Sequence, residues 1–280
     1  MYEIQVREDL APVTKLFEVS APEIARKAKP GQFVIVRIDE DGERVPLTIA
    51  DFDRTKGTLT IIFQEVGKTT RQLGKMKPGD QLASVTGPLG LPSEIENYGT
   101  VLTVGGGVGV APVFPIARAL HDAGNHVISV MGARDKSLLF WEDKMRGVSD
   151  ELIVCTDDGS YGRKALVTVP VKELLEARKD IKMIWAIGPA IMMKFVSLTT
   201  KPFGVKTIVS LNSIMVDGTG MCGACRVEVG GTTRFVCVDG PEFDGHVVDW
   251  DLLMGRQRQY VPEEKAALER YKCNCGEDAA

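Results

Sequence analysis

The stretch Gly99–Gly124, GTVLTVGGGVGVAPVFPIARALHDAG, decides the fold of the middle of this chain. Its apolar start predicts a buried strand, the glycines predict a tight loop, and the remainder predicts a helix. Such a loop can receive a pyrophosphate, because backbone N–H groups and the helix N-terminus point toward it. A strand–helix turn with packing glycines is the alternative, since the ordinary dinucleotide fingerprint would need a glycine at Val110. The candidate nucleotide-binding residues here are Gly105, Gly107, Val108, Gly109, Ala111 and Pro112.

The sequence around this stretch divides the chain into four parts. Residues 1–97 read as short strands separated by glycine and proline turns, which predicts a small antiparallel barrel. Within 98–205, HVISVMGAR, ELIVCTDD and IKMIWAIG are further apolar strands between helical stretches, which predicts a parallel α/β sheet. Residues 206–247 are rich in glycine, cysteine and turns, and 248–280 form a tail with an amphipathic helix beginning at Pro262. The predicted fold class is therefore mixed.

Composition excludes several classes of protein. The chain has 280 residues, 44% of them hydrophobic and 26% charged, as is usual for a globular protein. A net charge of −4 gives no reason to expect nucleic-acid binding. No apolar run has the length of a membrane span, and the N-terminus lacks the features of a signal peptide, so we expect a cytoplasmic protein.

Six cysteines are too few for a disulfide scaffold in a chain of this length. Cys222, Cys225 and Cys237 lie close together, and Cys273 and Cys275 lie in the tail. In a reduced compartment such clustering favours a metal site. Cys155, inside an apolar strand, reads as a small buried hydrophobic residue.

Several stretches, taken in order, resemble the ferredoxin–NADP reductase superfamily over roughly residues 5–205. Besides the glycine loop they are PGQFV (Pro30–Val34), RVPLTIAD (Arg44–Asp51), VGKTTRQL (Val66–Leu73), DGSYG (Asp158–Gly162) and GPAIMM (Gly188–Met193). The resemblance implies that the N-terminal barrel binds FAD and that the α/β domain binds a nicotinamide nucleotide. Hydride then passes between NAD(H) and FAD, a step that geometry controls without acid–base catalysis.

The resemblance also implies the flavin-binding residues. The superfamily's Arg-x-Tyr-Ser/Thr motif aligns with Val45, Pro46, Leu47 and Thr48, and Arg44 lies one residue early. Thr48 keeps the hydroxyl placed near flavin N5 and is the candidate catalytic residue, whereas the stacking tyrosine is replaced by Leu47, so we expect the flavin to pack on aliphatic groups. Arg44 either neutralises the FAD pyrophosphate or is a solvated surface residue. The remaining candidates are Ile62, Phe63, Gln64 and the phosphate or ribityl cradle Gly67, Lys68, Thr69 and Thr70, for which a plain β-turn is the alternative.

Nucleotide selectivity is expected at the ends of two strands. Relatives specific for NADP commonly have serine and arginine after the strand that corresponds to ELIVCTDD, where this chain has Asp157 and Asp158. A carboxylate favours a ribose diol and repels a 2′-phosphate, so the sequence predicts NAD(H) over NADP(H). Arg134 is a candidate for a phosphate contact and weakens this case. Gly188 and Pro189 complete the set, although the superfamily's usual cysteine before this glycine is Ile187 here.

The cysteine spacing predicts an iron–sulfur site. Placing Asp217 first gives Asp-x4-Cys-x2-Cys-x11-Cys, the spacing of a plant-type [2Fe–2S] cluster with a carboxylate in place of one thiolate. A carboxylate is an oxygen donor that Fe(III) accepts. The alternatives are that Asp217 is a turn residue, that Cys273 or Cys275 is the fourth ligand, or that the cysteines form a zinc knuckle. The candidate cluster ligands are Asp217, Cys222, Cys225 and Cys237.

The segment Val209–Val229, VSLNSIMVDGTGMCGACRVEV, carries a second resemblance. It is similar to the electron-transfer subunits of dihydroorotate dehydrogenase, which have a cysteine at position 217. It is more similar to the small FAD-carrying subunits of NADH-dependent reduced ferredoxin:NADP oxidoreductases, also called sulfide dehydrogenase small subunits, where an aspartate is expected.

This second resemblance implies an oxidoreductase subunit that works with a larger flavoprotein. That partner carries [4Fe–4S] clusters and exchanges electrons with ferredoxin, so the chain contacts ferredoxin only indirectly, in electron bifurcation. Electron transfer from dihydroorotate to NAD is the alternative function. A metal-stabilised binding module with vestigial nucleotide folds is an alternative of another class.

Overall fold

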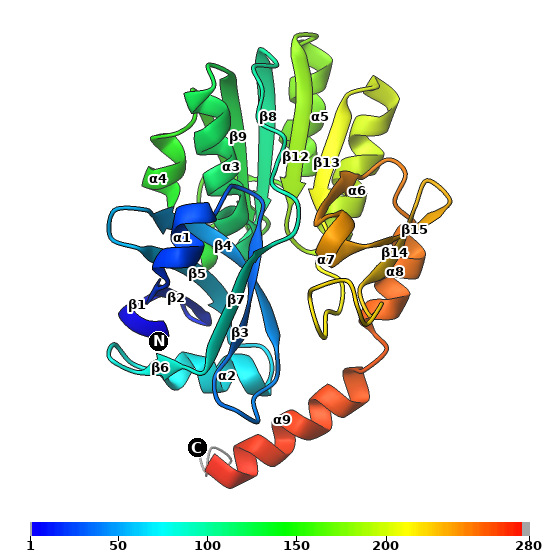
Figure 1. The fold of residues 1–280 in the computed structure, drawn as a ribbon. Helices are drawn as coiled ribbons and strands as arrows, with labels where there is room; N and C mark the ends of the chain where they lie inside the picture. The colour runs from blue at the N-terminus through cyan, green and yellow to red at the C-terminus, as the bar shows by residue number, and fades with distance from the viewer. Residues whose placement is uncertain (1, 276–280) are drawn as a thin grey trace.

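The N-terminal part is an antiparallel sheet that curls into a barrel, as the short strands and turns predict (Figure 1). The computed structural model describes residues 2–275 of the chain, and its side chains through Lys272. The strands lie in the order β6-β1-β2-β5-β4-β3-β7. Their bounds are β1 Tyr2–Ala11, β2 Thr14–Ser20, β3 Phe33–Arg37, β4 Val45–Asp53, β5 Thr58–Gln64, β6 Gln81–Leu82 and β7 Ser84–Leu89, with helices α1 Pro22–Lys27 and α2 Lys68–Lys75 between them.

The middle part is a parallel sheet with helices on both faces, as the alternating apolar strands predict. The sheet has the order β11-β10-β9-β8-β12-β13-β16, in which only β16 is antiparallel to its neighbour. Its strands are β8 Thr100–Gly106, β9 His126–Ala133, β10 Glu151–Thr156, β11 Arg163–Lys164, β12 Ile181–Ile187 and β13 Lys206–Ser210. Its helices are η1 Gly107–Gly109, α3 Val110–Asp122, η2 Lys136–Leu138, α4 Glu142–Arg146, α5 Thr168–Ala177, α6 Ala190–Thr200 and η3 Lys201–Phe203.

The C-terminal part is joined to this sheet rather than set apart from it. Its elements are β14 Arg226–Val229, β15 Thr232–Phe235, α7 Val236–Asp239, β16 Glu242–Asp244, α8 Trp250–Gln257 and α9 Val261–Cys275. Strand β16 pairs with β13, with Ile208 opposite Asp244. The sheet therefore extends past residue 205, where the sequence suggests a boundary between two segments.

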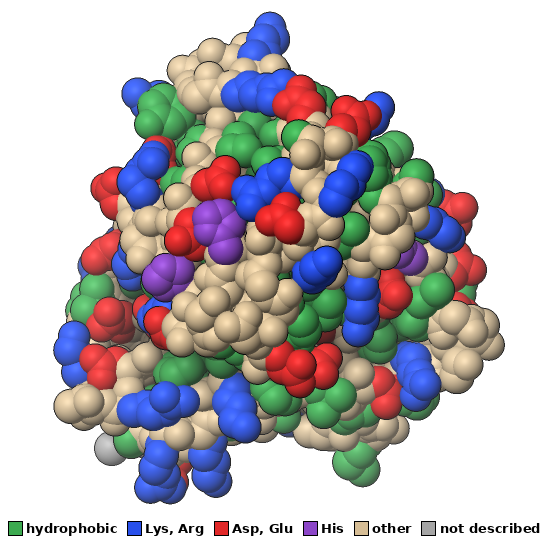
Figure 2. Space-filling model, turned by 90° about the horizontal axis from the view of Figure 1, so that it is seen from above, with side chains coloured by type: hydrophobic (Ala, Val, Ile, Leu, Met, Phe, Trp, Pro, Cys, Tyr) green, Lys and Arg blue, Asp and Glu red, His purple; other side chains and the backbone are tan. Residues whose placement is uncertain are grey.

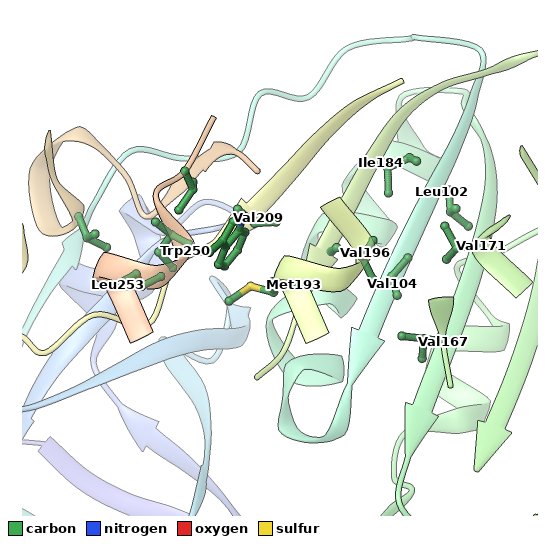
Figure 3. Packing of buried hydrophobic residues seen from close by; sticks show 14 of the residues in the cluster. Leu102, Val104, Val167, Val171, Ile184, Met193, Val196, Val209, Trp250 and Leu253 are labelled. Atoms are coloured by element: carbon green, nitrogen blue, oxygen red, sulfur yellow. The ribbon is translucent and has the colours of Figure 1, made fainter. Parts of the chain in front are cut away.

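One apolar core connects the nucleotide-binding sheet with the C-terminal part. In Figure 3 it can be followed from Leu102, Val104 and Ile184 of the sheet, through Val196 and Met193 of α6, to Val209, Trp250 and Leu253. Met193 and Val196 are fully buried, and Leu253 of α8 is 1% exposed. Burial of this many apolar side chains in one cluster holds the C-terminal part against α6.

The last helix leaves the body of the molecule. Helix α9 begins beside α8 and runs under the barrel to α2, where Lys75 Nζ lies 4.9 Å from the centre of the Tyr271 ring (Figure 1). Most of its described side chains are exposed. Among the described residues, no helix is both long and apolar enough to cross a bilayer.

The end of the nucleotide-binding domain away from the barrel carries interspersed charges of both signs (Figure 2). Arg178 donates hydrogen bonds to Glu151 at 2.7 Å and to Asp180 at 2.9 Å, and Thr100 donates to Asp180 at 2.7 Å. These pairs link the segment before β12 to the amino ends of β8 and β10. They place no field of a single sign on this face.

Candidate functional site

The glycine loop and the GPAIMM turn meet at the carboxyl edge of the parallel sheet. A Cβ on Gly109 would lie 2.1 Å from the carbonyl oxygen of Ile187, so only glycine allows the two turns to approach this closely. Packing therefore explains Gly109. Gly107 differs, because its φ of +56° requires glycine while a Cβ there would meet nothing within 4 Å. Open space beside backbone N–H groups, followed directly by α3, suits a pyrophosphate.

The other residues expected in this part lie around the same edge. Ala111 and Val110 are buried in the first turn of α3, whereas Val108 and Pro112 are partly exposed. Pro189 is the residue that precedes α6, next to Gly188. Ala111 can thus offer only backbone atoms to a ligand.

Arg134, Asp157 and Asp158 are brought together at the ends of β9 and β10. The Asp157 N–H donates to the Ala133 carbonyl at 3.0 Å, and the Asp158 N–H donates to the Arg134 carbonyl at 3.2 Å. The Asp158 carboxylate accepts hydrogen bonds from the Ser160 hydroxyl and N–H, which lower its pKa below the ordinary value. The Asp158 carboxylate is therefore held in place at the carboxyl end of β10.

On the barrel, alternation along β4 decides which residues face the nucleotide-binding domain. Leu47 and Ile49 point into the barrel core, whereas Ala50 packs with α3. Ile49 pairs with Ile61, so Thr48 lies on the same side of the sheet as Ile62, which packs with α3, and it faces the nucleotide-binding domain. Pro46 shares the parity of Thr48. The Leu47 side chain is 9% exposed and cannot provide the aliphatic surface expected for the flavin.

Strand β5 divides its residues in the same way. Phe63 points into the barrel core and forms an edge-on contact with Phe17, whereas Ile62 packs in the cluster that contains α3. The partly exposed Gln64 ends the strand. The glycine loop η1 lies next to β5, so Ile62 and Gln64 are near both domains.

Gly67–Thr70 begins a helix, which rules out the plain β-turn. Gly67 is the N-cap of α2, and the Thr70 hydroxyl accepts hydrogen bonds from the N–H groups of Gly67 at 3.0 Å and Val66 at 3.1 Å. Thr69 is buried and its hydroxyl donates to Glu43. Backbone donors at the first turn, including those of Lys68 and Thr69, are the groups that a phosphate cradle requires.

The three clustered cysteines and Asp217 lie in and beside the cluster loop, Asp217–Cys225. Cys225 and Cys237 are each 2% exposed, and their Sγ atoms lie 3.3 Å apart. Burial, and then the neighbouring Cys225, raises the pKa of Cys237 to about 12. Two thiolates this close would need a cation beside them, and iron held by Cys225 and Cys237 would supply that charge.

Cys222 and Asp217 form the second half of the site. The N–H groups of Ala224, Asp217 and Val216 point at the Cys222 sulfur and lower its pKa, while the Asp217 carboxylate acts in the opposite direction. Backbone donors aimed at sulfur are typical of iron–sulfur sites. Cys225 and Cys237 thus form one close pair, and Cys222 lies near Asp217 in the adjoining loop.

Asp217 also makes the turn interaction that the sequence leaves open. Its Oδ2 accepts hydrogen bonds from the Thr219 N–H at 3.0 Å and from the Thr219 hydroxyl. These bonds lower the pKa of Asp217, and the positive charge of Arg44 adds to the effect. Arg44 is exposed, as the surface-residue alternative expects, and its charge also reaches the cluster loop, while Gly218 in that loop lies against Ile35 of the barrel.

Among the described residues, no three His, Cys, Asp or Glu side chains converge on one point to hold a single metal ion. The side chains of Cys273 and Cys275 lie outside the described part of the chain.

Glu242 is a residue of this region that sequence reasoning did not find. Its carboxyl accepts hydrogen bonds from the Ser93 hydroxyl at 2.6 Å and from Trp185 Nε1 at 3.3 Å. Ser93 belongs to the connection between the barrel and the sheet, Trp185 lies on β12, and Glu242 lies on β16, so one carboxyl joins three parts. Burial raises its pKa to about 7. A glutamate in PEFDG carries no sequence signal for this position.

Cys155 is fully buried, as its apolar strand predicts.

Comparison with known proteins identifies the same parts. Residues 212–249 match the model of the iron–sulfur cluster binding domain of dihydroorotate dehydrogenase B. The chain is 52% identical over 261 residues to the "dihydroorotate dehydrogenase B (NAD(+)), electron transfer subunit homolog" of Thermotoga maritima, covering 93% of this chain and 92% of the relative. It is 36% identical over 250 residues to the electron transfer subunit of this enzyme from Desulforamulus reducens, covering 86% and 95%.

A solved structure is similar over nearly the whole chain. It is a chain of the NADH-dependent reduced ferredoxin–NADP oxidoreductase, described in connection with flavin-based electron bifurcation. It is 50% identical, with a TM-score of 0.92, and the match covers 97% of this chain and 98% of that one. These similarities confirm the predicted fold and the predicted class, an oxidoreductase flavoprotein with FAD, NAD(H) and [2Fe–2S] as cofactors. The chain belongs to the family of the electron-transfer subunits of dihydroorotate dehydrogenase B.

Proposed function

We propose that this chain is the small subunit of a bifurcating ferredoxin:NADP transhydrogenase. It exchanges hydride between NAD(H) and FAD and passes single electrons through a [2Fe–2S] cluster to a larger flavoprotein with [4Fe–4S] clusters. Ferredoxin reacts with that partner, so its contact with this chain is indirect. The proposal places the chain in the cytoplasm.

The observation that carries this proposal is the aspartate at position 217 of the cluster loop, where it precedes Cys222 and Cys225 at the plant-type spacing. A thiolate is expected at position 217 in a dihydroorotate dehydrogenase subunit, and the aspartate distinguishes the two functions. The similarity to the NADH-dependent reduced ferredoxin–NADP oxidoreductase chain over almost the entire length supports the same choice.

Each group of residues has a defined task. When bound, FAD takes a hydride from NADH and releases the electrons singly, and the cluster accepts one electron at a time. Thr48 faces the nucleotide-binding domain and orients the flavin, and Arg44 compensates the negative charge of Asp217. The first turn of α2 and the open side of Gly107 hold phosphates, while Asp158 selects the ribose diol. Cys222, Cys225, Cys237 and Asp217 hold the two irons.

The second candidate is the electron-transfer subunit of an NAD-dependent dihydroorotate dehydrogenase. The match of residues 212–249 to the iron–sulfur domain of that enzyme favours it. It assigns the same cofactors to this chain and differs in the partner. The metal-stabilised binding module is not a candidate, because the comparisons confirm the class and the cofactors.

Two measurements test the proposal in sequence. An absorption spectrum of the anaerobically purified chain, followed by rapid mixing with NADH, is expected to show bleaching of flavin and then of iron–sulfur bands. The chain is then isolated with its partner from its own host. This complex is expected to reduce NADP with NADH and reduced ferredoxin, and to leave dihydroorotate unoxidised. Oxidation of dihydroorotate by the complex would establish the second candidate. A purified chain without flavin and iron–sulfur absorption would contradict both candidates.

A further inference from the structure

A pocket of about 250 Å³ lies beside the cluster loop, between the chain that enters this loop and helix α8. The residues used below to describe it are Ser213, Arg226, Arg256 and Leu253, and we call it the arginine pocket. Leu253 is 1% exposed and packs in the apolar core of Figure 3, so this wall is held in place. The volume is smaller than that of sites for nucleotide-sized ligands, which begin at roughly 300 Å³.

The pocket carries positive charge and no compensating acid. Arg226 and Arg256 both line it, and none of the described lining residues is Asp or Glu. Arg226 donates to the Gly223 carbonyl at 3.2 Å, and Arg256 donates to the Ala224 carbonyl at 3.1 Å. Each bond fixes a guanidinium through one of its five N–H donors, which leaves other donors available to a ligand.

Ser213 adds a second, independent feature. It is 9% exposed, and within the described structure its hydroxyl has no hydrogen-bond partner. A buried hydroxyl without a partner is unfavourable, and in native proteins such a group usually marks a bound water, ion or ligand. Ser213 is one of the residues that line the same pocket as the two arginines.

We propose that the arginine pocket binds an oxyanion. The ligand is a free tetrahedral anion such as inorganic phosphate, or a carboxylate. Two guanidinium groups supply charge-assisted hydrogen bonds, and the Ser213 hydroxyl donates a third. Both arginines also hold carbonyls of the cluster loop, so an anion in the pocket stiffens the loop that carries Cys222 and Cys225.

Calorimetric titration of the purified chain with phosphate, sulfate and acetate, at an ionic strength kept constant with chloride, tests the site. We expect one saturable site. Replacing Arg256 by Gln removes a charge-assisted hydrogen bond and weakens the affinity about tenfold. Arg256→Lys keeps the positive charge, and its affinity for the anion is expected to lie between those of the natural chain and Arg256→Gln. Arg258→Gln, two residues along and outside the pocket lining, is the matched control and leaves the affinity unchanged.

Ser213→Ala separates a ligand site from a packing defect. It is expected to weaken anion binding without lowering the melting temperature of the anion-free chain, since the hydroxyl loses no protein partner. If only phosphate and sulfate bind, the ligand is a tetrahedral anion. If acetate binds as well, the pocket also accepts a carboxylate. Heats no different from those of chloride, or equal losses in Arg256→Gln and Arg258→Gln, would overturn the proposal.

A second readout follows iron release to a chelator, which saturating phosphate is expected to slow. It rests on the proposed cluster, whereas the titration does not. A normal titration in a chain without iron would therefore refute the proposed function and leave the oxyanion site standing.

Discussion

Arg118 on helix α3 donates a hydrogen bond of 2.7 Å to Asp51 at the end of the barrel strand β4. The guanidinium also lies over the rings of Phe114 and Phe52, at 5.1 and 5.9 Å from their centres. The two side chains are 32% and 20% exposed, so this pair is partly shielded from water. It joins the barrel to the nucleotide-binding domain along β4, the strand that carries Thr48.

Breaking this pair is expected to lower stability. Asp51→Asn should reduce the free energy of unfolding by about 1–2 kcal/mol, because a half-buried guanidinium loses a charged partner. Urea unfolding measures the change. The control is Glu23→Gln, which breaks a pair whose side chains are 73% and 65% exposed and should cost under about 0.5 kcal/mol. Equal losses would mean that Arg118 and Asp51 contribute no more than a surface pair.

Glu242 is expected to make stability depend on pH. Burial raises its pKa to about 7, so between the ordinary glutamate value and pH 7 the unfolded chain ionises this group and the folded chain does not. Its contribution to folding is therefore fully present at low pH and is lost as the pH rises through about 7.

Glu242→Gln removes that dependence, since its amide oxygen can accept from Trp185 while its N–H donates to Ser93. The stability difference between Glu242→Gln and the natural chain should move in favour of the variant by on the order of 2 kcal/mol between pH 5 and pH 8. Urea unfolding at both pH values tests this. Parallel pH profiles of the two proteins would show that Glu242 does not titrate in this range.

The cluster loop predicts opposite outcomes for two substitutions at one position. Asp217→Cys restores the plant-type spacing and should keep a [2Fe–2S] cluster with a lower potential, because thiolate donates more electron density than carboxylate. Asp217→Ala should give a labile cluster. Redox titration followed by EPR measures both, and flavin reduction by NADH should remain normal. Unchanged spectra and potentials in the two variants would show that Asp217 is only a turn residue, held by its hydrogen bonds from Thr219.

Nucleotide choice should follow the charge after β10. Replacing Asp157 with Ser and Asp158 with Arg removes two carboxylates and adds a cation where a 2′-phosphate would lie. The ratio of flavin-reduction rates with NADPH and NADH should rise by about two orders of magnitude. Asp122→Asn, at the far end of α3, should leave the ratio unchanged. A natural chain that already prefers NADPH would contradict the assignment of Asp158.

The tail cysteines should be dispensable for the cluster. Asp217 and the three clustered cysteines fill four ligand positions, so a variant with both Cys273→Ser and Cys275→Ser should retain its full iron content. Iron analysis and the visible spectrum measure this. Loss of iron would move the fourth ligand from Asp217 to the tail.

The sequence predicts the elements of this fold better than the contacts between them. Apolar runs such as TVLTV and the glycine loop identify strand, loop and helix, because their signals are local. The pairing of β16 with β13 is different: three residues join a strand more than thirty positions away, and tertiary packing alone decides it. The same holds for Glu242, whose partners Ser93 and Trp185 come from distant segments.

The site shows the same division. Spacing and resemblance together predict the four cluster ligands, and the structure places Cys225 next to Cys237 with Cys222 in the adjoining loop. Arg44 is exposed, which matches one of its two expected positions, but the sequence does not reveal that its charge reaches Asp217 in the cluster loop. Nor does it reveal that Leu47 points into the barrel, since that depends on the parity of β4 relative to the core.

The shared apolar core has a mechanical consequence. The core runs from the nucleotide-binding sheet through α6 into α8, and it also takes in Phe33 and Ile35 of the barrel strand β3. Strand β16 extends the sheet, and Arg118 with Asp51 adds a polar link between α3 and the barrel. The barrel, the nucleotide-binding sheet and the C-terminal part therefore share close-packed contacts, so a shift in one part is passed on to the others.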